Sequence, residues 1–338
     1  MKHLQRDILL EATSHDFEKQ AVLNPAVWQD GNTLHMFYRA VAWGNHSTIG
    51  YARFEGPTKL VERLDRPLII PEYDYEKQGI EDPRIVKLGD TFYLTYAAYD
   101  GVSSRIAYAT SKDLKTFEKQ GIISPNLTYK EAEQHFNQNK LKERYFFFSS
   151  YFRDRVSSDI IVWEKDGFFL PAKIKGKYGL VHRILPDVQV IFFDDFKQLQ
   201  DNQYWISYLE KMSDNVLLEN THWFESRNIG GGAPLIETSA GWLMIYHGIE
   251  ELNVSRIYSA GAALLDKDDL RVVGRLSEPL FKPTLDWEKS GDVRGVVFPT
   301  GTAIFDNILY IYYGAADSRI GYISFELDDL IREVITSA

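Results

Sequence analysis

A pattern that occurs five times constrains the fold of this chain more than any other feature of its sequence. Each copy has a proline at the predicted start of a strand, then a turn, then an aromatic strand followed by a polar or charged residue. The clearest copies begin at Asn24-Pro25 and at Asp82-Pro83. The prolines of the five copies, the third of them weak, are Pro25, Pro83, Pro171, Pro234 and Pro299, separated by 58, 88, 63 and 65 residues.

A second motif downstream supports the same register. It occurs in full at Ser47–Ala52, Ser104–Ala109 and Ser318–Ile323, and as a fragment at Ser255–Tyr258. Repeats of this length built from short strands indicate blades around an axis, because one four-stranded sheet cannot bury both of its faces alone. We therefore predict an all-β fold, a five-bladed β-propeller with a central substrate pocket, as one domain over residues 1–338.

Composition limits the classes of function. The chain has no cysteine, so neither disulfides nor thiolate chemistry are available. A net charge of −10 argues against a nucleic-acid-binding surface, and an anionic ligand would need its own cluster of basic side chains. No segment is long enough to span a membrane and the first residues lack the apolar run of a signal peptide, so we expect a cytoplasmic protein. Aromatic residues, at 14%, suit strand packing and also stacking against sugars.

The longest spacing between prolines indicates an insertion at residues 124–166. Within it, Tyr129–Arg144 is polar and rich in helix formers, which predicts a solvated helix. Tyr145–Phe152 and Ile160–Trp163 are predicted to be strands. Leu327–Ile335 is predicted to be a short terminal helix that closes the last blade. We expect the insertion to shape the acceptor side of the pocket or a subunit contact rather than to join the core of a blade.

Residues near the repeat prolines are candidates to line the pocket, because the innermost strands of a propeller begin at its axis. They are Asn24, Asp82, Arg84, Lys173, Gly232 and Thr300. The polar residues near the ends of the second strands are also candidates: Arg39, Asp100, His182, Arg183, His247 and Asp317. For any one of these residues, a role in ending its strand explains the polar side chain about as well as a role in lining the pocket does. The segment Glu81–Arg84 is the exception, because two acids and an arginine at an inner strand are costly unless they are paired or used.

In this order and at this spacing, the motifs resemble family 130 of the glycoside hydrolases, the β-mannoside phosphorylases and β-mannosidases. The resemblance covers nearly the whole chain and rests mainly on Asn24–Ala26, Tyr38–Arg39, Gly79–Ile85, Tyr96–Gly101, Arg105–Leu114, Leu170–Tyr178, His182–Arg183, Gly230–Pro234, Gly241–Gly248, Val297–Gly301 and Tyr313–Asp317. It implies an inverting phosphorylase. Inorganic phosphate would release α-mannose 1-phosphate from a manno-oligosaccharide, a mannosyl-glucose or a mannosyl-N-acetylglucosamine, with phosphate as co-substrate and no cofactor or metal.

The resemblance also assigns roles. Asp82 would be the catalytic acid and would protonate the bridging oxygen through the sugar's own 3-hydroxyl. Because phosphate brings its own negative charge, the site needs cations where an ordinary inverting glycosidase places a carboxylate base. The residues expected on the phosphate side are Arg105, Lys173 and His182, with Arg153, Arg155 or Arg183 as a second arginine; those expected on the sugar are Asn24, Arg39, Arg84, Asp100, His247 and Asp317. Arg105 lies in register with Arg256 and Arg319, so a structural role is a real alternative for it.

Several alternatives remain at this point. A hydrolase of the same family would use a glutamate in place of the phosphate clamp, and a furanosidase-type hydrolase would use Asp82, Asp100 and Asp317. A non-catalytic sugar-binding propeller would leave the acid and the basic residues unexplained.

The glycines at 230–232 suit a close approach of substrate to the backbone better than a nucleotide loop, since no helix pattern follows. The histidines have no metal-ligand spacing. The acceptor sugar, its linkage and the number of subunits stay open, and a homo-oligomer is compatible with the sequence.

Overall fold

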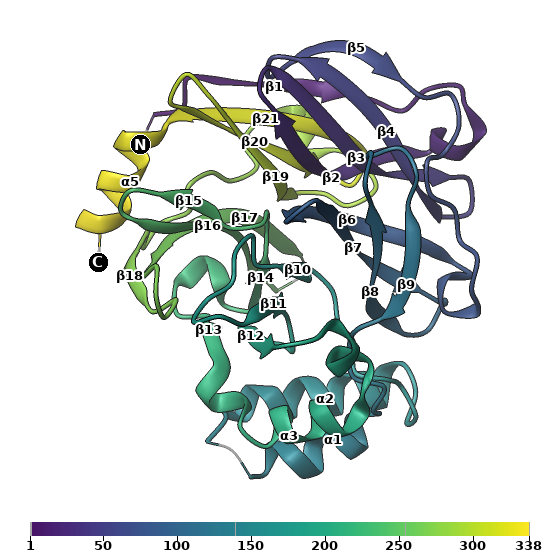
Figure 1. Cartoon of the computed structure of the whole chain (residues 1–338), viewed down its shortest axis with the longest axis vertical. Helices are drawn as coiled ribbons and strands as arrows, with labels where there is room; N and C mark the ends of the chain where they lie inside the picture. Colours follow the sequence, from purple (N-terminus) through teal and green to yellow (C-terminus); the bar gives the residue numbers. More distant parts are fainter. Residues whose placement is uncertain (1, 139, 254, 338) are drawn as a thin grey trace.

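The computed structural model describes residues 2–138, 140–253 and 255–337. Strands dominate it and form four sheets, which confirms the all-β class. The largest sheet consists of two four-stranded antiparallel halves, joined by a single parallel bridge between Ser47 and Gly79. The strands therefore group into five antiparallel units, which follow one another around the middle of the molecule in Figure 1. Among the described residues, none of the four sheets closes on itself.

The units take their strands in chain order. The first contains β2 (Ala21–Asp30), β3 (Thr33–Ala42), β4 (His46–Glu55) and β5 (Lys59–Arg63). The second contains β6 (Gly79–Leu88), β7 (Thr91–Tyr99), β8 (Ser104–Ser111) and β9 (Glu118–Ile122). The third contains β10 (Phe168–Phe169), β11 (Tyr178–His182), β12 (Val188–Phe193) and β13 (Val216–Leu218). The fourth contains β14 (Asn228–Gly231), β15 (Ile236–Thr238), β16 (Gly241–Glu251), β17 (Arg256–Leu265) and β18 (Val272–Arg275).

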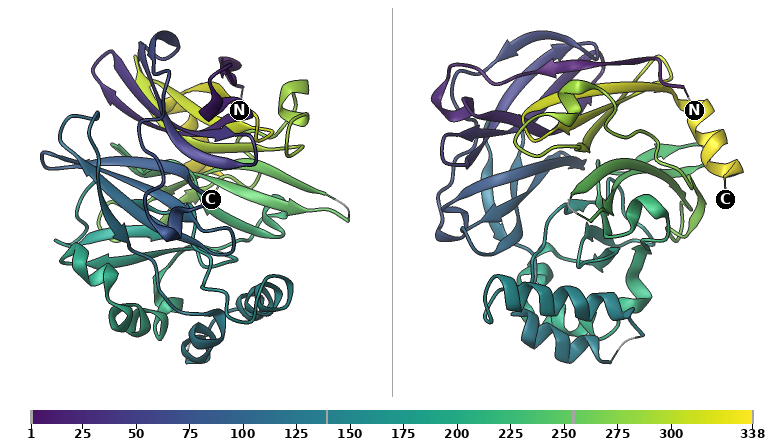
Figure 2. Two further views of the ribbon diagram at one scale, coloured as in Figure 1. Left: turned by 90° about the vertical axis from the view of Figure 1, so that its right-hand side faces the viewer. Right: turned by 180° about the vertical axis from the view of Figure 1, so that it is seen from behind.

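The fifth unit joins the two ends of the chain. It contains β19 (Val297–Phe305), β20 (Ile308–Ala315) and β21 (Arg319–Glu326), and its outer strand is β1 (Gln5–Leu10), which pairs antiparallel with β21. Figure 2 shows the purple N-terminal strand lying beside the yellow C-terminal strands. The innermost strands also contact one another, β19 with β2, β2 with β6 and β6 with β10. The first and last units are therefore neighbours in space.

Three of the five repeat prolines lie inside the innermost strands rather than at their starts, whereas Pro171 and Pro234 lie outside strands, after β10 and β14. Both findings correct the prediction from sequence. Pro25, Pro83 and Pro299 fall within β2, β6 and β19, each at a shift in strand register. Such β-bulges are where a strand tolerates proline, because the ladder is interrupted there. Asn24 and Asp82, directly before their prolines, take positive φ angles of 48° and 51°. The bulges thus hold two polar residues in a strained conformation of the kind that clusters at functional sites.

A buried glutamate supports the second strand of every unit. Glu18, Glu76, Glu225 and Glu288 are fully buried and accept hydrogen bonds of 2.6–2.7 Å from Tyr38, Tyr96, Tyr246 and Tyr313. Each of these four also pairs with a cation at 2.6–3.0 Å, respectively Arg63, Lys119, Arg275 and Arg6. In the third unit, Glu164 takes this place and contacts His182 Nδ1 at 2.9 Å. The sequence signal is an aromatic residue followed by glutamate, at residues 17–18, 75–76, 163–164, 224–225 and 287–288.

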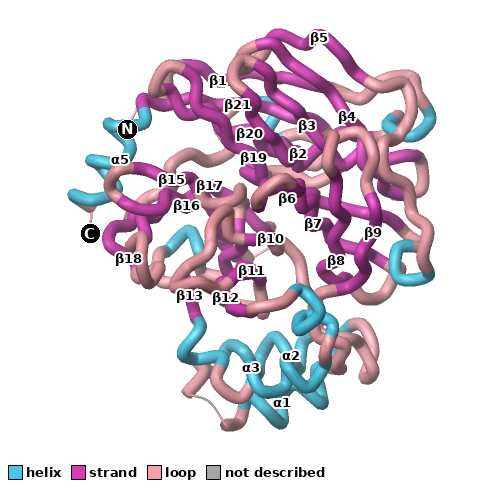
Figure 3. Tube along the Cα trace, viewed as in Figure 1, coloured by secondary structure: helices cyan, strands magenta, loops and turns pink. Residues whose placement is uncertain are grey.

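Short helical turns carry four of these glutamates, and the longer helices gather on the third unit. The short ones are η1 (Asp16–Glu18), η2 (Asp74–Glu76), η5 (Trp223–Glu225) and α4 (Asp286–Lys289), and the others are α1 (Tyr129–Phe136), α2 (Glu143–Arg155), η3 (Phe196–Gln200), α3 (Asn202–Leu209), η4 (Met212–Asn215) and α5 (Leu327–Thr336). Figure 3 shows α1, α2 and α3 together at one side of the sheets and α5 near the N-terminus. The terminal helix predicted from sequence is confirmed. In the described ranges, no helix has the length and apolar character needed to cross a membrane.

The insertion differs from its prediction in three ways. The segment expected to be an aromatic strand, Tyr145–Phe152, is part of helix α2, and its buried side chains Tyr145, Phe148, Ser149 and Phe152 follow the spacing of one helical face. The predicted strand at Ile160–Trp163 makes only an isolated bridge between Ile161 and Thr128. The helix expected to be solvated, α1, buries Tyr129, Ala132 and Phe136 in a core shared with α2, α3 and the neighbouring strands. The insertion is therefore part of the packed core.

Candidate active site

A cavity of about 480 Å³ opens where the innermost strands of several units meet. This volume lies within the range of small-molecule sites. Its lining comes from β2, β3, β6, β14, β16, β17 and β19, from the C-terminal end of helix α2 and from the loops between these elements. The charged side chains that line it are Arg39, Asp82, Arg155, Lys165, Asp166, Arg183, Arg227, Arg256 and Asp317. The cavity thus combines carboxylates with a larger number of cations in an acidic chain.

Asp82 stands at the centre of a dense polar network. Its carboxylate accepts a 2.7 Å hydrogen bond from Asn24 Nδ2 and lies 3.7 Å from Arg39 Nη1. The adjacent Glu81 accepts from Arg39 Nη2 at 2.7 Å and from Lys165 Nζ at 2.8 Å. The two bulges therefore place Asn24 and Asp82 face to face, with Arg39 and Lys165 as their cationic partners.

The two carboxylates of this centre differ in their electrostatics. Burial alone would raise the pKa of Asp82, but Arg39 and Lys165, with the hydrogen bond from Asn24, outweigh it and hold that pKa below its usual value. For Asp317, burial dominates and the Asp82 charge adds to it, so its pKa rises to about 6 despite the opposing effect of Arg39. In the ligand-free protein, Asp82 is therefore ionised and Asp317 titrates close to neutral pH.

A second group of polar atoms under the cavity lacks hydrogen-bond partners within the described part of the chain. It comprises both carboxylate oxygens of Asp166, both ring nitrogens of His247, Arg84 Nη2 and Arg183 Nε. Arg183 Nη1 lies 2.8 Å from Asp166 Oδ2, and His247 Nε2 lies 3.9 Å from the same oxygen. Buried polar groups are normally satisfied, and each unpaired one costs about 1–3 kcal/mol. Their concentration here indicates a place for a polar ligand or ordered water.

Arg84 has a different environment from the one predicted. Its guanidinium is fully buried and donates to the carbonyl oxygens of Gly232, Asp82 and Pro83. These bonds tie the bulge of β6 to the loop after β14. Arg84 is absent from the cavity lining, so within the described residues its contacts are those of a support beneath Asp82.

Two arginines of the cavity depend on helix α2. Arg227 is stacked over Phe148 and Tyr151 of helix α2, with its guanidinium carbon 5.2 and 5.5 Å from the two ring centres. It also contacts Glu251 at 2.5 Å. Arg155 reaches the cavity from the last turn of the same helix. The helical insertion thus borders the cavity and supports two of its arginines.

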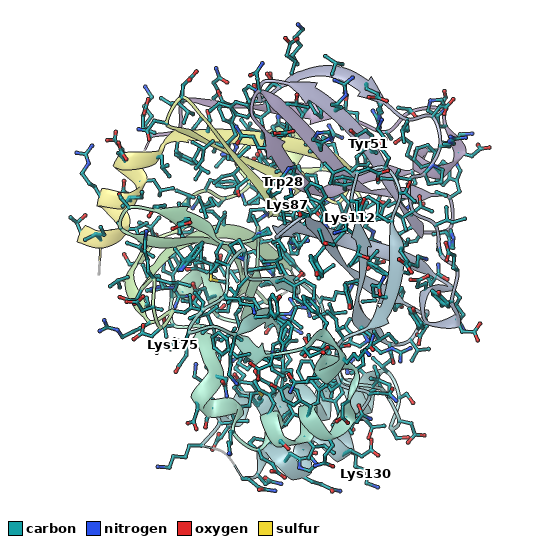
Figure 4. The ribbon with its side chains drawn as sticks, in the orientation of Figure 1. Trp28, Tyr51, Lys87, Lys112, Lys130 and Lys175 are labelled. Atoms are coloured by element: carbon teal, nitrogen blue, oxygen red, sulfur yellow. The ribbon has the colours of Figure 1, made fainter. Side chains whose placement is uncertain are left out.

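The structure does not bring all the predicted phosphate-side residues to this cavity. Lys173 is exposed in the β10–β11 hairpin with its ammonium 4.1 Å from the ring centre of Tyr178, and Figure 4 shows Lys175 of the same hairpin at the edge of the molecule. His182 is fully buried between Glu164 and Tyr208, with hydrogen bonds of 2.9 and 2.8 Å. Arg105 lies 4.0 Å from Asp100, whose carboxylate caps the turn at Val102 and Ser103. The predicted residues that do meet at the cavity are Asn24, Arg39, Asp82, Arg155, Arg183 and Asp317, with His247 beneath them.

Several residues of the site escaped the analysis of the sequence, namely Lys165, Asp166, Arg227, Arg256 and Tyr258. Lys165 and Asp166 directly follow the aromatic–glutamate pair of the third unit, and this pair would have fixed the register of the weak repeat. The same pair would have aligned His182 with the buried tyrosines of the other units. Arg227 has no repeat partner, and only its packing on helix α2 reveals it. In the portion of the chain that the structure describes, no group of three or more acidic or histidine side chains could hold a metal ion.

Comparison with known proteins agrees with this architecture. Residues 10–335 match the family described as beta-1,4-mannooligosaccharide phosphorylase, glycoside hydrolase family 130. A 1,2-beta-oligomannan phosphorylase of Thermoanaerobacter sp. (strain X514) is 32% identical over 96% of both chains. A beta-1,2-mannobiose phosphorylase of the same strain is 34% identical over 94% of this chain and 93% of the relative. The solved structure of a beta-1,2-mannobiose phosphorylase from Listeria innocua, bound to beta-1,2-mannobiose, shares the fold with a TM-score of 0.70. The two chains are 22% identical, and the match covers 94% of this chain and 92% of the Listeria chain. The chain belongs to glycoside hydrolase family 130, the family of the β-mannoside phosphorylases.

Proposed function

We propose that this protein is an inverting β-mannoside phosphorylase that transfers a terminal β-mannosyl unit to inorganic phosphate and releases α-mannose 1-phosphate. The observation that carries the proposal is the composition of the cavity. A single acid network, centred on Asp82, adjoins more cationic than acidic side chains. An ordinary inverting glycosidase would instead have a second carboxylate there to act as the base. The names of the two relatives that match over more than nine-tenths of both chains point to β-1,2-linked mannosides as the first substrates to test.

Asp82 is the proton donor in this mechanism, acting through the 3-hydroxyl of the mannosyl unit. Asn24, Arg39 and Asp317 surround it and would hold that unit. The lowered pKa of Asp82 in the free protein fits this role once phosphate is present. A phosphate anion bound in the cavity would add negative charge near Asp82 and raise its pKa, which favours the protonated form that the proton donor needs.

The phosphate would bind among Arg183, Arg227 and Arg256, close to the Tyr258 hydroxyl. Burial raises the pKa of Tyr258, and the charges of these three arginines and of Asp317 act on it. Guanidinium groups hold phosphate through paired hydrogen bonds, and His247 and Arg183 have nitrogens without partners among the described residues. This set takes the place of Arg105, Lys173 and His182 in the prediction from sequence.

We also propose that the five units form a five-bladed β-propeller. The two halves of the largest sheet act as separate blades, and β1 completes the last blade beside β21. The buried glutamate that recurs in each unit supports the same count. A cytoplasmic location and a homo-oligomer remain predictions from sequence.

The test is an assay of β-1,2-mannobiose, β-1,4-mannobiose, mannosyl-glucose and mannosyl-N-acetylglucosamine, each with and without phosphate. We expect mannose 1-phosphate from at least one substrate, and only when phosphate is present. Arg183→Ala should raise the KM for phosphate more than the KM for the sugar. Lys173→Ala is the matched control, because its ammonium lies on the surface over Tyr178.

One observation favours a hydrolase as the second candidate. Asp166 presents a carboxylate under the cavity whose oxygens accept no hydrogen bond from the described residues, so it could activate water as a base. Its 2.8 Å contact with Arg183 speaks against this, because a base should be free to take a proton. Release of mannose at equal rates in phosphate-free buffer, lost in Asp166→Asn, would establish the hydrolase instead.

A further inference from the structure

Each of the helices α1, α2 and α3 contributes one buried tyrosine to the core that these helices share with the third unit. We call Tyr129, Tyr145 and Tyr208 the helix tyrosines. None of the three is among the described residues that line the cavity of the candidate active site. Their hydroxyl groups nevertheless hold two short segments that reach the cavity, residues 163–166 and residues 182–185.

Tyr208 of α3 holds the segment 182–185 through a histidine. Its hydroxyl oxygen lies 2.8 Å from His182 Nε2, and Nδ1 of the same ring lies 2.9 Å from Glu164 Oε1. The other carboxylate oxygen of Glu164 accepts a hydrogen bond from the backbone N–H of Arg183 at 3.2 Å. Helix α3 is therefore connected to both segments by one continuous chain of hydrogen bonds.

Tyr145 of α2 acts on the same segment from the other side of Arg183. Gln189 Nε2 donates to the tyrosine hydroxyl at 2.9 Å and to the carbonyl oxygen of Ile184 at 2.8 Å, and Gln189 Oε1 accepts from the N–H of Ile184 at 2.7 Å. The tyrosine itself donates to Asp187 at 2.9 Å. The chain is therefore fixed at the residue before Arg183 and at the residue after it.

Tyr129 of α1 holds the other segment. Its hydroxyl oxygen accepts a hydrogen bond from the backbone N–H of Trp163 at 3.2 Å, and the next N–H, of Glu164, donates to the carbonyl oxygen of Ser104 at 2.9 Å. Both bonds lie directly before Lys165, which lines the cavity. Tyr129 thus helps to set the position of the segment that carries this lysine.

The contacts of the third unit depart from the pattern of the other four. In those units, the buried glutamate meets a tyrosine of the second strand together with a lysine or an arginine. In the third unit, His182 replaces the tyrosine of the strand, and the hydroxyl comes from helix α3. No lysine or arginine side chain pairs with Glu164 in the described part of the chain. Because Glu164 directly precedes Lys165 and Asp166, this departure indicates a role in the site beyond the stability of a blade.

We propose that the helix tyrosines are positioning residues for the binding of phosphate. Acting through the two segments, they set the direction of Arg183 and of Asp166, whose side chains lie 2.8 Å apart under the cavity. This inference rests on the proposed function, because it takes Arg183 for a ligand of phosphate. A guanidinium holds phosphate through a fixed fork of N–H groups, so a small shift of its backbone costs one of the two paired bonds.

The sugar side of the site does not depend on these helices in the same way. Asn24 and Arg39 belong to the first unit, and Asp317 lies between two strands of the fifth. Loss of a hydroxyl group from a helix tyrosine should therefore weaken the binding of phosphate and leave the binding of the mannoside almost unchanged.

The experiment compares wild type with Tyr129→Phe, Tyr145→Phe, Tyr208→Phe and Tyr204→Phe. Each substitution removes one hydroxyl group and keeps the aromatic ring. Tyr204 is the matched control, because it lies one turn before Tyr208 on the same helix and donates to the carbonyl oxygen of Phe192 at 2.5 Å, outside both segments. The measurements are the KM for phosphate, the KM for β-1,2-mannobiose, and amide hydrogen exchange by mass spectrometry in peptides that cover the two segments.

We expect substitution of each helix tyrosine to raise the KM for phosphate by about two- to tenfold, the range of one lost hydrogen bond. The KM for mannobiose should stay within about twofold of wild type, and amide exchange in the held segment should become faster. Tyr204→Phe should change none of the three. If the KM for phosphate in all three variants matches that of Tyr204→Phe, or if the KM for mannobiose rises equally, the assignment is wrong.

Failure of the proposed function would look different. If wild type cleaves mannobiose at equal rates without phosphate, or does not cleave it at all, the proposed function fails whatever the variants do. Amide exchange, which needs no turnover, then decides the inference. Faster exchange of the segments 163–166 and 182–185 in the three variants than in Tyr204→Phe supports the positioning role, and equal exchange overturns it.

Discussion

At the scale of single residues, Asp82 is the group whose chemistry the proposed reaction depends on most. Asp82→Asn retains the shape of the side chain and its hydrogen bond from Asn24 Nδ2, but it has no proton to give. We expect turnover to fall by about 10²–10⁴, the usual contribution of general acid catalysis. Calorimetric binding of mannobiose and the melting temperature should stay close to wild type. A rate within a few-fold of wild type would place the acid elsewhere.

His247 gives a second prediction at this scale, concerning stability. Burial lowers its pKa to about 4 in the folded protein, against an ordinary value of about 6.5 in the unfolded chain. Between these values the unfolded chain binds a proton that the folded protein does not. The group's contribution to the free energy of unfolding is therefore complete above pH 6.5 and is lost toward pH 4, by about 1.4 kcal/mol per pH unit.

The measurement is urea denaturation of wild type and His247→Gln from pH 5 to pH 7 in buffers without phosphate. The difference in unfolding free energy, wild type minus variant, should increase with pH over this range. Parallel profiles of the two proteins would show that His247 titrates at its ordinary pKa.

At the scale of elements, helix α2 offers a matched pair of arginines. Arg155 lines the cavity around Asp82, whereas Arg153 pairs with Glu133 of helix α1 at 2.8 Å. Arg155→Ala should raise the KM for phosphate because it removes positive charge from the cavity, and Arg153→Ala should leave it unchanged. Steady-state kinetics at varied phosphate concentration check this. Equal effects of the two substitutions would mean that the end of α2 does not face the phosphate.

The recurring buried glutamates give a second prediction for the elements. Glu76 is fully buried with Lys119, whose side chain is 3% exposed, and it accepts a hydrogen bond from Tyr96 at 2.6 Å. Glu76→Gln leaves the lysine charge buried without its partner, which typically costs about 3–5 kcal/mol. Glu72→Gln, at an exposed position of the same segment, is the control and should cost little. Chemical denaturation compares the two, and similar stabilities would contradict the assigned role.

At the scale of the whole molecule, the pairing of β1 with β21 joins the two ends of the chain. Arg6 on β1 also contacts Glu288 of the fifth unit at 2.6 Å. Removal of residues 2–10 should lower the melting temperature by about 5 °C or more, because an entire strand and a buried ion pair are lost. Differential scanning calorimetry measures this. An unchanged transition would show that the fifth unit is stable without β1 and would weaken the case for a closed ring of blades.

Much of this molecule follows from its sequence alone. The repeat of prolines and aromatic strands determined the all-β class and the number of units, because each unit repeats the same local pattern of turns and strands. The segment Glu81–Arg84 drew attention to Asp82, because so many charges at an inner strand need partners. The helical spacing of Tyr145, Phe148 and Phe152 was also present in the sequence, but their aromatic character favoured a strand in the prediction.

Only the tertiary structure decided which cations serve the cavity. Lys173, His182 and Arg105 carry suitable groups, but the hairpin, the core of the third unit and the Asp100 turn hold them away from the cavity. Lys165, Arg227 and Arg155 reach it because the short third unit and the packing of helix α2 place them there. Sequence patterns report the period of a strand or helix. The direction of a side chain at the meeting point of five units depends on bulges and on contacts between residues far apart in the chain.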